Sequence, residues 1–460
     1  MTVSLRDVAR GTAERLRAAE PLNATLHWSP ELLEGEAARA EALSADAPLR
    51  GVPVAIKDNI VTVEQPTTCG SRILAGYTSP FNATVIDRLR GAGALIACKA
   101  NLDEFAMGSS TEHSAYGRVK HPLDAERVPG GSSGGSGALV AAGVVPAALG
   151  SETGGSVRQP ASFCGVVGVK PTYGRVSRYG LVAFGSSLDC ISVFGDTVET
   201  ASRVLRVIAG PDPRDATSVD RPAIEPLRVP ASLRGITVGL PREYFPADLH
   251  PGVKAGCDRA IARLRDLGAT IVDVSLPNSR YAVPTYYIIA PAEAAANLAR
   301  FDGARYGNRQ GDGDVRALYR ATRGSGFGPE VRRRILIGTY ALSAGYADAY
   351  YNRAQAARMR IVQDFDAVFA SGVDLLFTPT APSPAFKAGE KTDDPVAMYL
   401  ADIFVCPASL AGIPAMSQPL GRSEGLPVGG QLIAPAFEES RMLASAALLA
   451  ADLDATAEVR

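Results

Sequence analysis

The chain has 460 residues, of which 46% are hydrophobic and 21% charged, a balance typical of a globular protein with a large core. Its formal net charge of −1 excludes a global field that would recruit nucleic acid or a membrane surface. No uninterrupted apolar run is long enough to span a bilayer, and residues 1–7 lack the basic-then-apolar layout of a signal peptide.

The six cysteines are widely separated, and none belongs to a Cys-x-x-Cys pair. This spacing argues against a zinc site and against a disulfide framework in a chain of this length. It predicts a protein of the reducing cytoplasm, in which each cysteine is a small core residue rather than a nucleophile. The residues are Cys69, Cys98, Cys164, Cys190, Cys257 and Cys406.

The first 20 residues are predicted to form a helix, because Ser4-x-x-Asp7 resembles a capping box and apolar residues follow at helical spacing. A second, polar helix is expected over 32–45. From residue 51 the hydrophobic pattern alternates between strands and helices, which predicts a largely parallel or mixed sheet covered on both faces. The predicted strands are 52–56, 94–98, 236–240, 270–274, 373–377 and 428–434, and the predicted helices are 84–90, 138–142, 252–267 and 438–452.

These elements predict one α/β/α domain that uses the whole chain, residues 1–460. We expect N-terminal helices in 1–49, a catalytic core in 50–280 and completion of that core by 371–460. Residues 285–370 are rich in Ala, Arg and Tyr with little strand character, which predicts a helical insertion.

Three segments carry residues suited to chemistry. Lys57 follows the apolar residues Val54 to Ile56, and the segments 130–136 and 150–158 place serines on glycine-rich backbone. Hydrolysis of an amide requires a nucleophile, a base and donors for the oxyanion. A lysine can be the base if burial lowers its pKa from about 10.4, although most lysines lie at the surface.

Other interpretations of these segments fit less well. None of the four histidines stands beside a serine in a Gly-x-Ser-x-Gly turn, so a Ser-His-Asp triad is a weak hypothesis. A phosphate-binding loop would need a Gly-Lys pair that neither segment has. A flexible linker would be flanked by polar sequence, whereas residues 137–150 are strongly apolar. The remaining interpretation is that the glycine-rich backbone presents its amide groups to an oxyanion, with serines beside them.

Together these segments resemble the signature of the amidase signature family, and the resemblance covers about residues 49–440. Ser132 follows Lys57 by 75 residues, and Ser156 follows Ser132 by 24, spacings typical of that family's Lys–Ser–Ser triad. The resemblance implies that Ser156 is the acylated nucleophile, Ser132 a bridging serine after a cis peptide, and Lys57 the final base. The implied oxyanion hole consists of the backbone amides of Thr153, Gly154, Gly155 and Ser156.

Further segments resemble the branch of that family formed by the A subunits of amidotransferases that act on Glu-tRNA(Gln) and Asp-tRNA(Asn). The resemblance implies release of ammonia from glutamine, without a metal or cofactor in this chain. It implies a large partner that uses ATP and magnesium and contacts most of the tRNA, a small linker subunit, and no membrane. The segments are 103–110, 167–180, 297–303, 330–335 and 398–403.

Free glutamine carries an α-carboxylate and an α-ammonium, which pair well with an arginine and a carboxylate. The resemblance assigns these substrate-binding roles to Arg334 and Asp402. From the residues alone, the run 332–334 is more typical of a solvated helix face, and only the resemblance favours glutamine binding. Either Tyr286 or Tyr287 is expected to line the same pocket.

The chain departs from the family pattern at two positions. Glu152 stands where the family has Asp, and its extra methylene is expected close to Ser156, where it could shift the loop. Thr153 and Glu152 are also candidates to border the path of ammonia. Cys190 stands where the family often has Gln.

Two other functions remain open from the sequence. A stand-alone amidase acting on small amides would use the same triad, but it would need neither Arg334 nor Asp402. A catalytically silent scaffold protein would not need intact Lys57, Ser132 and Ser156.

Overall fold

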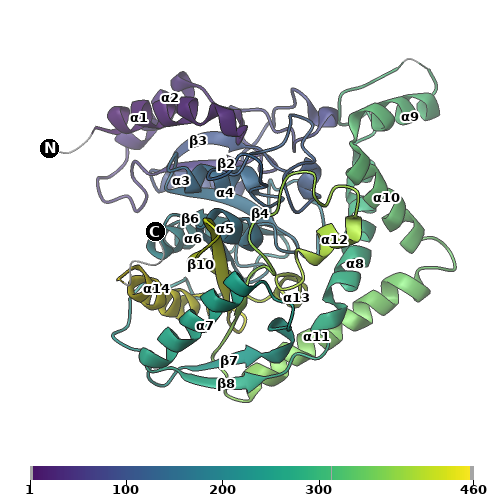
Figure 1. Cartoon of the computed structure of the whole chain (residues 1–460). Coiled ribbons are helices and arrows are strands. Elements are labelled where there is room, and N and C mark those ends of the chain that lie inside the picture. Colours follow the sequence, from purple (N-terminus) through teal and green to yellow (C-terminus); the bar gives the residue numbers. More distant parts are fainter. Residues whose placement is uncertain (1–3, 312, 456–460) are drawn as a thin grey trace.

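The computed structural model of the chain describes residues 4–311 and 313–455. Residues 1–3 of the first predicted helix and residues 456–460 lie outside this range. The described part contains one mixed sheet of eleven strands in the order β1-β3-β2-β4-β6-β5-β10-β11-β9-β7-β8 (Figure 1). The strands are β1 Thr25–His27, β2 Pro53–Lys57, β3 Leu95–Ala100, β4 Ala147–Glu152, β5 Val167–Lys170, β6 Cys190–Gly195, β7 Thr237–Pro241, β8 Thr270–Val274, β9 Leu375–Pro379, β10 Ala415–Ser423 and β11 Leu426–Ile433.

The sheet is parallel in two groups of three strands and antiparallel elsewhere. Strands β3, β2 and β4 are parallel neighbours, as are β9, β7 and β8. The strands between these groups, and β1 at the edge, pair antiparallel. The expected α/β class with a mixed sheet is therefore confirmed.

Helices cover both faces of the sheet because successive side chains of a strand point to opposite sides. On β2, Val54 and Ile56 join one hydrophobic cluster, whereas Ala55 joins another. The first cluster includes residues of α3 Thr84–Gly91, α6 Val198–Ile208, α7 Pro251–Asp266 and α14 Glu439–Ala455. The second includes residues of α1 Leu5–Ala18, α2 Pro30–Glu41, α4 Gly134–Ala141 and α5 Arg158–Cys164.

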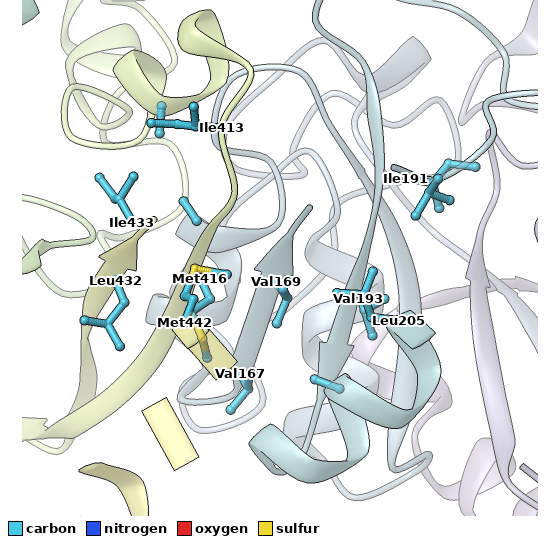
Figure 2. Close-up of a cluster of buried hydrophobic side chains, with 14 of the residues drawn as sticks. Val167, Val169, Ile191, Val193, Leu205, Ile413, Met416, Leu432, Ile433 and Met442 are labelled. Atoms are coloured by element: carbon cyan, nitrogen blue, oxygen red, sulfur yellow. The ribbon is translucent and has the colours of Figure 1, made fainter. Parts of the chain in front are cut away.

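Figure 2 shows the first cluster at the middle of the sheet. Val167 and Val169 of β5 lie beside Val193 of β6, and Met416 of β10 lies beside Met442 of α14. All five side chains are almost fully buried. The helices α6 and α14 are therefore fixed on this face by apolar contact, which is the main favourable term in folding.

Between β8 and β9 the chain is helical and lies along one side of the molecule (Figure 1). The helices there are α8 Ala282–Asn297, α9 Val315–Gly326, α10 Pro329–Ala341 and α11 Arg353–Ala370, and α12 Pro395–Leu400 and α13 Cys406–Ala411 follow β9. No helix in the described ranges is both long and apolar enough to cross a membrane. All six cysteines lie in the described part of the chain, where they are buried and form no disulfide with one another.

The predicted strands and most predicted helices are present with shifted ends. The helix predicted over 32–45 was wrong at its end, because α2 stops at Glu41. There Ser44 Oγ accepts a hydrogen bond of 3.3 Å from the amide of Asp46, a local turn that competes with the helix. Helix α4 begins at Gly134, four residues before the prediction. A Cβ on Gly135 would lie 2.3 Å from the Asn101 carbonyl oxygen, so these glycines permit close packing inside a helix.

Five strands have no counterpart in the predictions: β1, β4, β5, β6 and β10. β4 and β5 are too short or too rich in alanine and glycine to show a period of two. All of β6 and six of the nine residues of β10 are buried, and serine or glycine residues interrupt the apolar run in both strands.

Candidate active site

The segment of Lys57 and the two glycine-rich serine segments meet at one edge of the sheet. Lys57 is the last residue of β2, and β4, its parallel neighbour, ends at Glu152. The loop 153–157 then leads from β4 into α5, and the segment 130–133 leads into α4. The carboxyl ends of parallel strands share an edge, which is the usual position of a site in α/β proteins.

Lys57 and Ser132 are in direct contact. Both side chains are fully buried, and Lys57 Nζ donates to Ser132 Oγ at 2.8 Å and to the Ser151 carbonyl oxygen at 3.1 Å. The peptide bond between Gly131 and Ser132 is cis, as the family resemblance implies.

Ser156 lies on the neighbouring segment. The amide of Ser133 donates to the Ser156 carbonyl oxygen at 3.2 Å, which joins the two serine segments. Ser156 keeps 7% of its surface exposed, whereas Lys57 and Ser132 keep none. Of the three residues, Ser156 is therefore the one that solvent or a substrate can reach.

Burial lowers the pKa of Lys57 to about 7, against the opposing charges of Asp103, Asp189 and Glu152. The desolvation cost of a buried ammonium favours the neutral amine. A large fraction of Lys57 is consequently neutral near pH 7, which a proton acceptor requires.

The loop after β4 presents free amide donors. The amides of residues 153–156 donate no hydrogen bond to any group within residues 4–311 and 313–455. The Thr153 hydroxyl donates to Asp189 Oδ1 at 2.6 Å, and the same carboxylate accepts from the amides of Phe184 and Gly185. Asp189 therefore anchors the start of the loop while its amides stay available to an oxyanion.

Glu152, the first departure from the family pattern, is bonded to the far end of the same loop. Its Oε2 accepts from the amides of Val157 and Arg158 at 3.0 Å, and its Oε1 accepts from Arg158 Nε at 2.7 Å. Both side chains are fully buried. Glu152 thus joins the end of β4 to the first turn of α5 across the loop that carries Ser156.

Cys190, the second departure, begins β6 and is buried. Its Sγ lies 3.6 Å from the Leu188 carbonyl oxygen, and burial raises the pKa of the thiol. It is therefore a neutral core thiol rather than a nucleophile.

Arg334 does not lie on a solvated helix face. Of the run 332–334, Arg332 and Arg333 are exposed on α10, but Arg334 is only 2% exposed. Its Nε donates to Glu330 Oε1 at 2.8 Å, one helical turn earlier. Its two terminal nitrogens donate no hydrogen bond to any residue in the part of the chain that the structure describes. They are thus free to bind an anion.

Asp402 follows α12 and is 5% exposed. One oxygen accepts from the Ser109 hydroxyl, whereas Oδ1 is buried and has no hydrogen-bond partner among the described residues. Burial raises the pKa of Asp402 to about 7, although the Ser109 hydrogen bond and Arg334 lower it. A Cβ on Gly155 would lie 3.3 Å from Oδ1, so the unpartnered oxygen faces the loop of Ser156.

Both candidate tyrosines lie between these elements. A Cβ on Gly154 would lie 3.0 Å from the Tyr286 ring, so Tyr286 packs against the loop of Ser156. Tyr287 stacks on Tyr399 with ring centroids 3.5 Å apart, and the Arg334 guanidinium lies 5.2 Å from its ring. Tyr286 therefore borders the serine loop and Tyr287 borders the arginine.

Sequence reasoning did not assign Asp189, Glu330 or Ser109 to the site. Ser109 and Glu330 lie in segments that carry the family resemblance, and Asp189 precedes Cys190, but no role was assigned to any of the three. Glu330 had a usable signal, because a glutamate four residues before an arginine is a standard helix pair. The contacts of Asp189 and Ser109 connect residues 36 and 293 positions apart, which no local pattern reveals. Within the described residues, no group of three His, Cys, Asp or Glu side chains could hold a metal ion.

The sheet, the cis peptide and the lysine–serine contact together are typical of one class of protein. Comparison with known sequences identifies that class. A family model described as Amidase matches residues 7–443, so the chain belongs to the amidase family. The chain is 57% identical to the A subunit of the glutamyl-tRNA(Gln) amidotransferase of Chloroflexus aurantiacus, over 93% of this chain and 89% of that protein. It is 51% identical to the protein of the same name from Methanosarcina acetivorans, over 96% and 92% of the two chains.

Solved structures give the same family. The A subunit of the glutamyl-tRNA(Gln) amidotransferase of Thermotoga maritima matches with a TM-score of 0.80 and 44% identity, covering 97% of this chain and 91% of that chain. A 6-aminohexanoate cyclic dimer hydrolase matches with a TM-score of 0.84 and 26% identity, covering 99% and 95%. The backbone is thus shared by enzymes with different substrates, and the side chains of the pocket decide between them.

Proposed function

We propose that this chain is the glutamine-hydrolysing A subunit of an amidotransferase that acts on Glu-tRNA(Gln). The observation that carries the proposal is the pair of buried, opposite charges beside the serine loop. Among the described residues, the two terminal nitrogens of Arg334 and Oδ1 of Asp402 have no hydrogen-bond partner, and that oxygen faces Gly155. Buried charges are costly unless they are paired, so this arrangement suits a ligand with both charges.

Free glutamine is such a ligand. Its α-carboxylate would bind the terminal nitrogens of Arg334, and its α-ammonium would bind Asp402 Oδ1. Its side-chain amide would then reach the loop of Ser156. The stacked rings of Tyr287 and Tyr399 lie 5.2 and 5.7 Å from the guanidinium, within the range of a favourable cation–π contact.

The chemistry would run from Ser156 to Lys57. Ser156 Oγ bonds to the side-chain amide carbon of glutamine, while its proton passes to Ser132 Oγ and the proton of Ser132 passes to Lys57 Nζ. The amides of residues 153–156 stabilise the oxyanion. The proton returns by the same path to the leaving nitrogen, the C–N bond breaks, and ammonia leaves a glutamyl ester on Ser156. Water, deprotonated by the same relay, cleaves that ester to glutamate.

The ammonia would be used by other proteins of the assembly. A large partner would use ATP and magnesium to activate the misacylated tRNA and would bind most of that tRNA, and a small protein would link the two. The relatives from Chloroflexus and Thermotoga are named for glutamyl-tRNA(Gln), which favours this substrate over Asp-tRNA(Asn). Six unpaired cysteines suit the reducing cytoplasm in which such an assembly would work.

Replacing Asp402 with asparagine tests the substrate pocket. The variant keeps the volume and a partner for Ser109 but loses the charge, so kcat/KM for glutamine should fall about 10- to 100-fold. Butyramide has the same side-chain amide without the α-groups, and its kcat/KM should change by less than about threefold. Ammonia release by the full chain with each substrate measures both values. An equal loss for the two substrates would contradict the glutamine pocket.

Purification of the tagged chain from its native host tests the assembly. Mass spectrometry should identify one large and one small partner in equal amounts with the chain. Recovery of the chain alone, or only as a homo-oligomer, would instead favour a stand-alone amidase. That second candidate has a specific observation behind it, because a cyclic dimer hydrolase shares the whole fold. The Asp402 variant separates the two functions independently of any partner.

A further inference from the structure

Glu104 is a buried carboxylate that the proposed mechanism does not use. It begins the short 3-10 turn Glu104–Ala106 and is only 2% exposed. Its Oε2 accepts a hydrogen bond of 2.8 Å from the amide of Gly328, and its other oxygen accepts from the Ser71 hydroxyl. No lysine or arginine in the described ranges forms an ion pair with it. Burial raises the pKa of Glu104 to about 7, and burying a carboxyl group without a cationic partner is costly.

The partner of Glu104 is the residue on which α10 starts. Gly328 is the N-cap of α10 and supplies no side chain to cap the helix itself. In a capping box, a glutamate inside the helix accepts from the N-cap amide. Here Glu104, more than 200 residues away in the sequence, supplies that carboxylate instead. The N-terminus of α10 is thereby attached to the segment that precedes Ser109.

Helix α10 is held at its other end by close packing. Gly338 lies so near α8 that a Cβ on it would be 1.9 Å from the Pro291 carbonyl oxygen, and Figure 1 shows α10 beside α8. Arg334 lies between these two points, about 9 Å along the helix from Gly328 at 1.5 Å per residue. The position of the Arg334 guanidinium therefore depends on both attachments.

The same segment also contacts the opposite charge of the pocket. Five residues after Glu104, the Ser109 hydroxyl donates to Asp402. Between them, the ring of Phe105 packs against Phe301 and Phe327 with centroids 5.1 and 5.6 Å apart. The segment 104–109 thus touches the helix of Arg334 at one end and Asp402 at the other.

We propose that Glu104 is a positioning residue that holds α10, and with it Arg334, at the separation from Asp402 that fits the two charged groups of glutamine. The inference rests on the proposed function of Arg334 and Asp402. Glu104 acts through the helix and does not touch the substrate. Its loss should therefore impair binding of glutamine rather than the chemical step.

The test compares glutamine with butyramide in the full chain. In Glu104→Ala, KM for glutamine should rise about tenfold with kcat changed by less than about twofold, because a buried hydrogen bond to a charged group is lost. The kcat/KM for butyramide should change by less than about twofold, since it lacks the groups that Arg334 and Asp402 bind. Glu104→Gln should restore most of the affinity, because its amide oxygen can still accept from Gly328.

A reciprocal change tests the contact from the side of the helix. Gly328 has a φ of −70°, which alanine adopts without strain, but its Cβ would lie 2.3 Å from Glu104 Oε2. Gly328→Ala should consequently raise KM for glutamine, and the double variant with Glu104→Ala should be no worse than Glu104→Ala alone. Glu439→Ala is the matched control. Glu439 is a fully buried carboxylate bonded to Thr172 and Arg175, away from α10.

The outcomes are separable. Backbone amide exchange over residues 329–338 should be faster in Glu104→Ala than in Glu439→Ala, and unchanged exchange there would overturn the positioning role whatever the kinetics. Equal losses for glutamine and butyramide, or an unchanged KM in both Glu104→Ala and Gly328→Ala, would overturn it too. A native chain that hydrolyses butyramide but not glutamine would instead refute the proposed function. Amide exchange would still report whether Glu104 holds α10.

Discussion

Replacing Ser156 with alanine is expected to lower the rate of glutamine hydrolysis by at least about 10⁴-fold, because it removes the atom that forms the covalent ester. Ser156 is the member of the triad that keeps exposed surface, and its segment is joined to that of Ser132 through the amide of Ser133. Steady-state ammonia release measures the rate, and mass spectrometry of glutamine-treated protein should find no acyl adduct on the variant.

Ser136→Ala is the matched control for this change. Ser136 is buried in α4, and its hydroxyl donates to the Leu149 carbonyl oxygen at 2.9 Å, outside the proposed relay. The control should retain activity to within about tenfold, because it loses one neutral hydrogen bond of about 1 kcal/mol. Recovery of the partner proteins with the Ser156 variant would show that assembly survives. Substantial hydrolysis by that variant would mean that another group is the nucleophile.

Replacing Lys57 with methionine is expected to lower kcat by about 10²- to 10⁴-fold, the range that removal of a general base produces. Methionine fills most of the same buried volume, but it cannot accept the proton from Ser132 Oγ across the present 2.8 Å contact. KM for glutamine should change little, since Lys57 lies outside the pocket formed by Arg334 and Asp402. A variant that keeps kcat to within about tenfold would contradict the role of Lys57.

The pH dependence of the native chain gives a second measure of Lys57. Burial lowers its pKa to about 7, and only the neutral amine can accept a proton. The rate constant kcat should therefore rise with pH through about 7 and level off above it, and this rise should be absent in Lys57→Met. Asp402, whose pKa burial raises to about 7, must be ionised to bind an ammonium. It should contribute to the same rise in kcat/KM but not in kcat, because kcat reports the substrate-bound enzyme.

The sequence predicted the outer parts of the sheet better than its centre. Strands such as β2, β7 and β8 show apolar runs bounded by turns, and helices such as α7 show clear periodicity. Strands β4, β5 and β6 did not, because they are short or because alanine, glycine and serine residues interrupt their apolar runs. Their strand conformation comes from pairing with neighbours that lie far away in the sequence.

The candidate site was predictable as a set of residues but not as a geometry. The resemblance in motif and spacing to the amidase signature family singled out Lys57, Ser132 and Ser156, whereas the residues alone indicated only a glycine-rich backbone with serines that suits oxyanion chemistry. Arg334 was ambiguous within an exposed-looking run of arginines, and only its burial separates it from Arg332 and Arg333. Which arginine of this run is buried depends on which side of α10 faces Tyr287. Packing of α10 against α8 and α12 sets that orientation.

By itself, the sequence determined the class of fold, the family and the identity of the chemical groups, because these depend on local pattern and on motif spacing. The tertiary structure alone decided the state of those groups. The pKa of Lys57 falls because the strands around it exclude water. Asp402 is held through one oxygen by Ser109, 293 residues away, while its other oxygen has no partner among the described residues. Electrostatic energies depend on distance and on solvent exclusion, and both are set by contacts between segments that are remote in the chain.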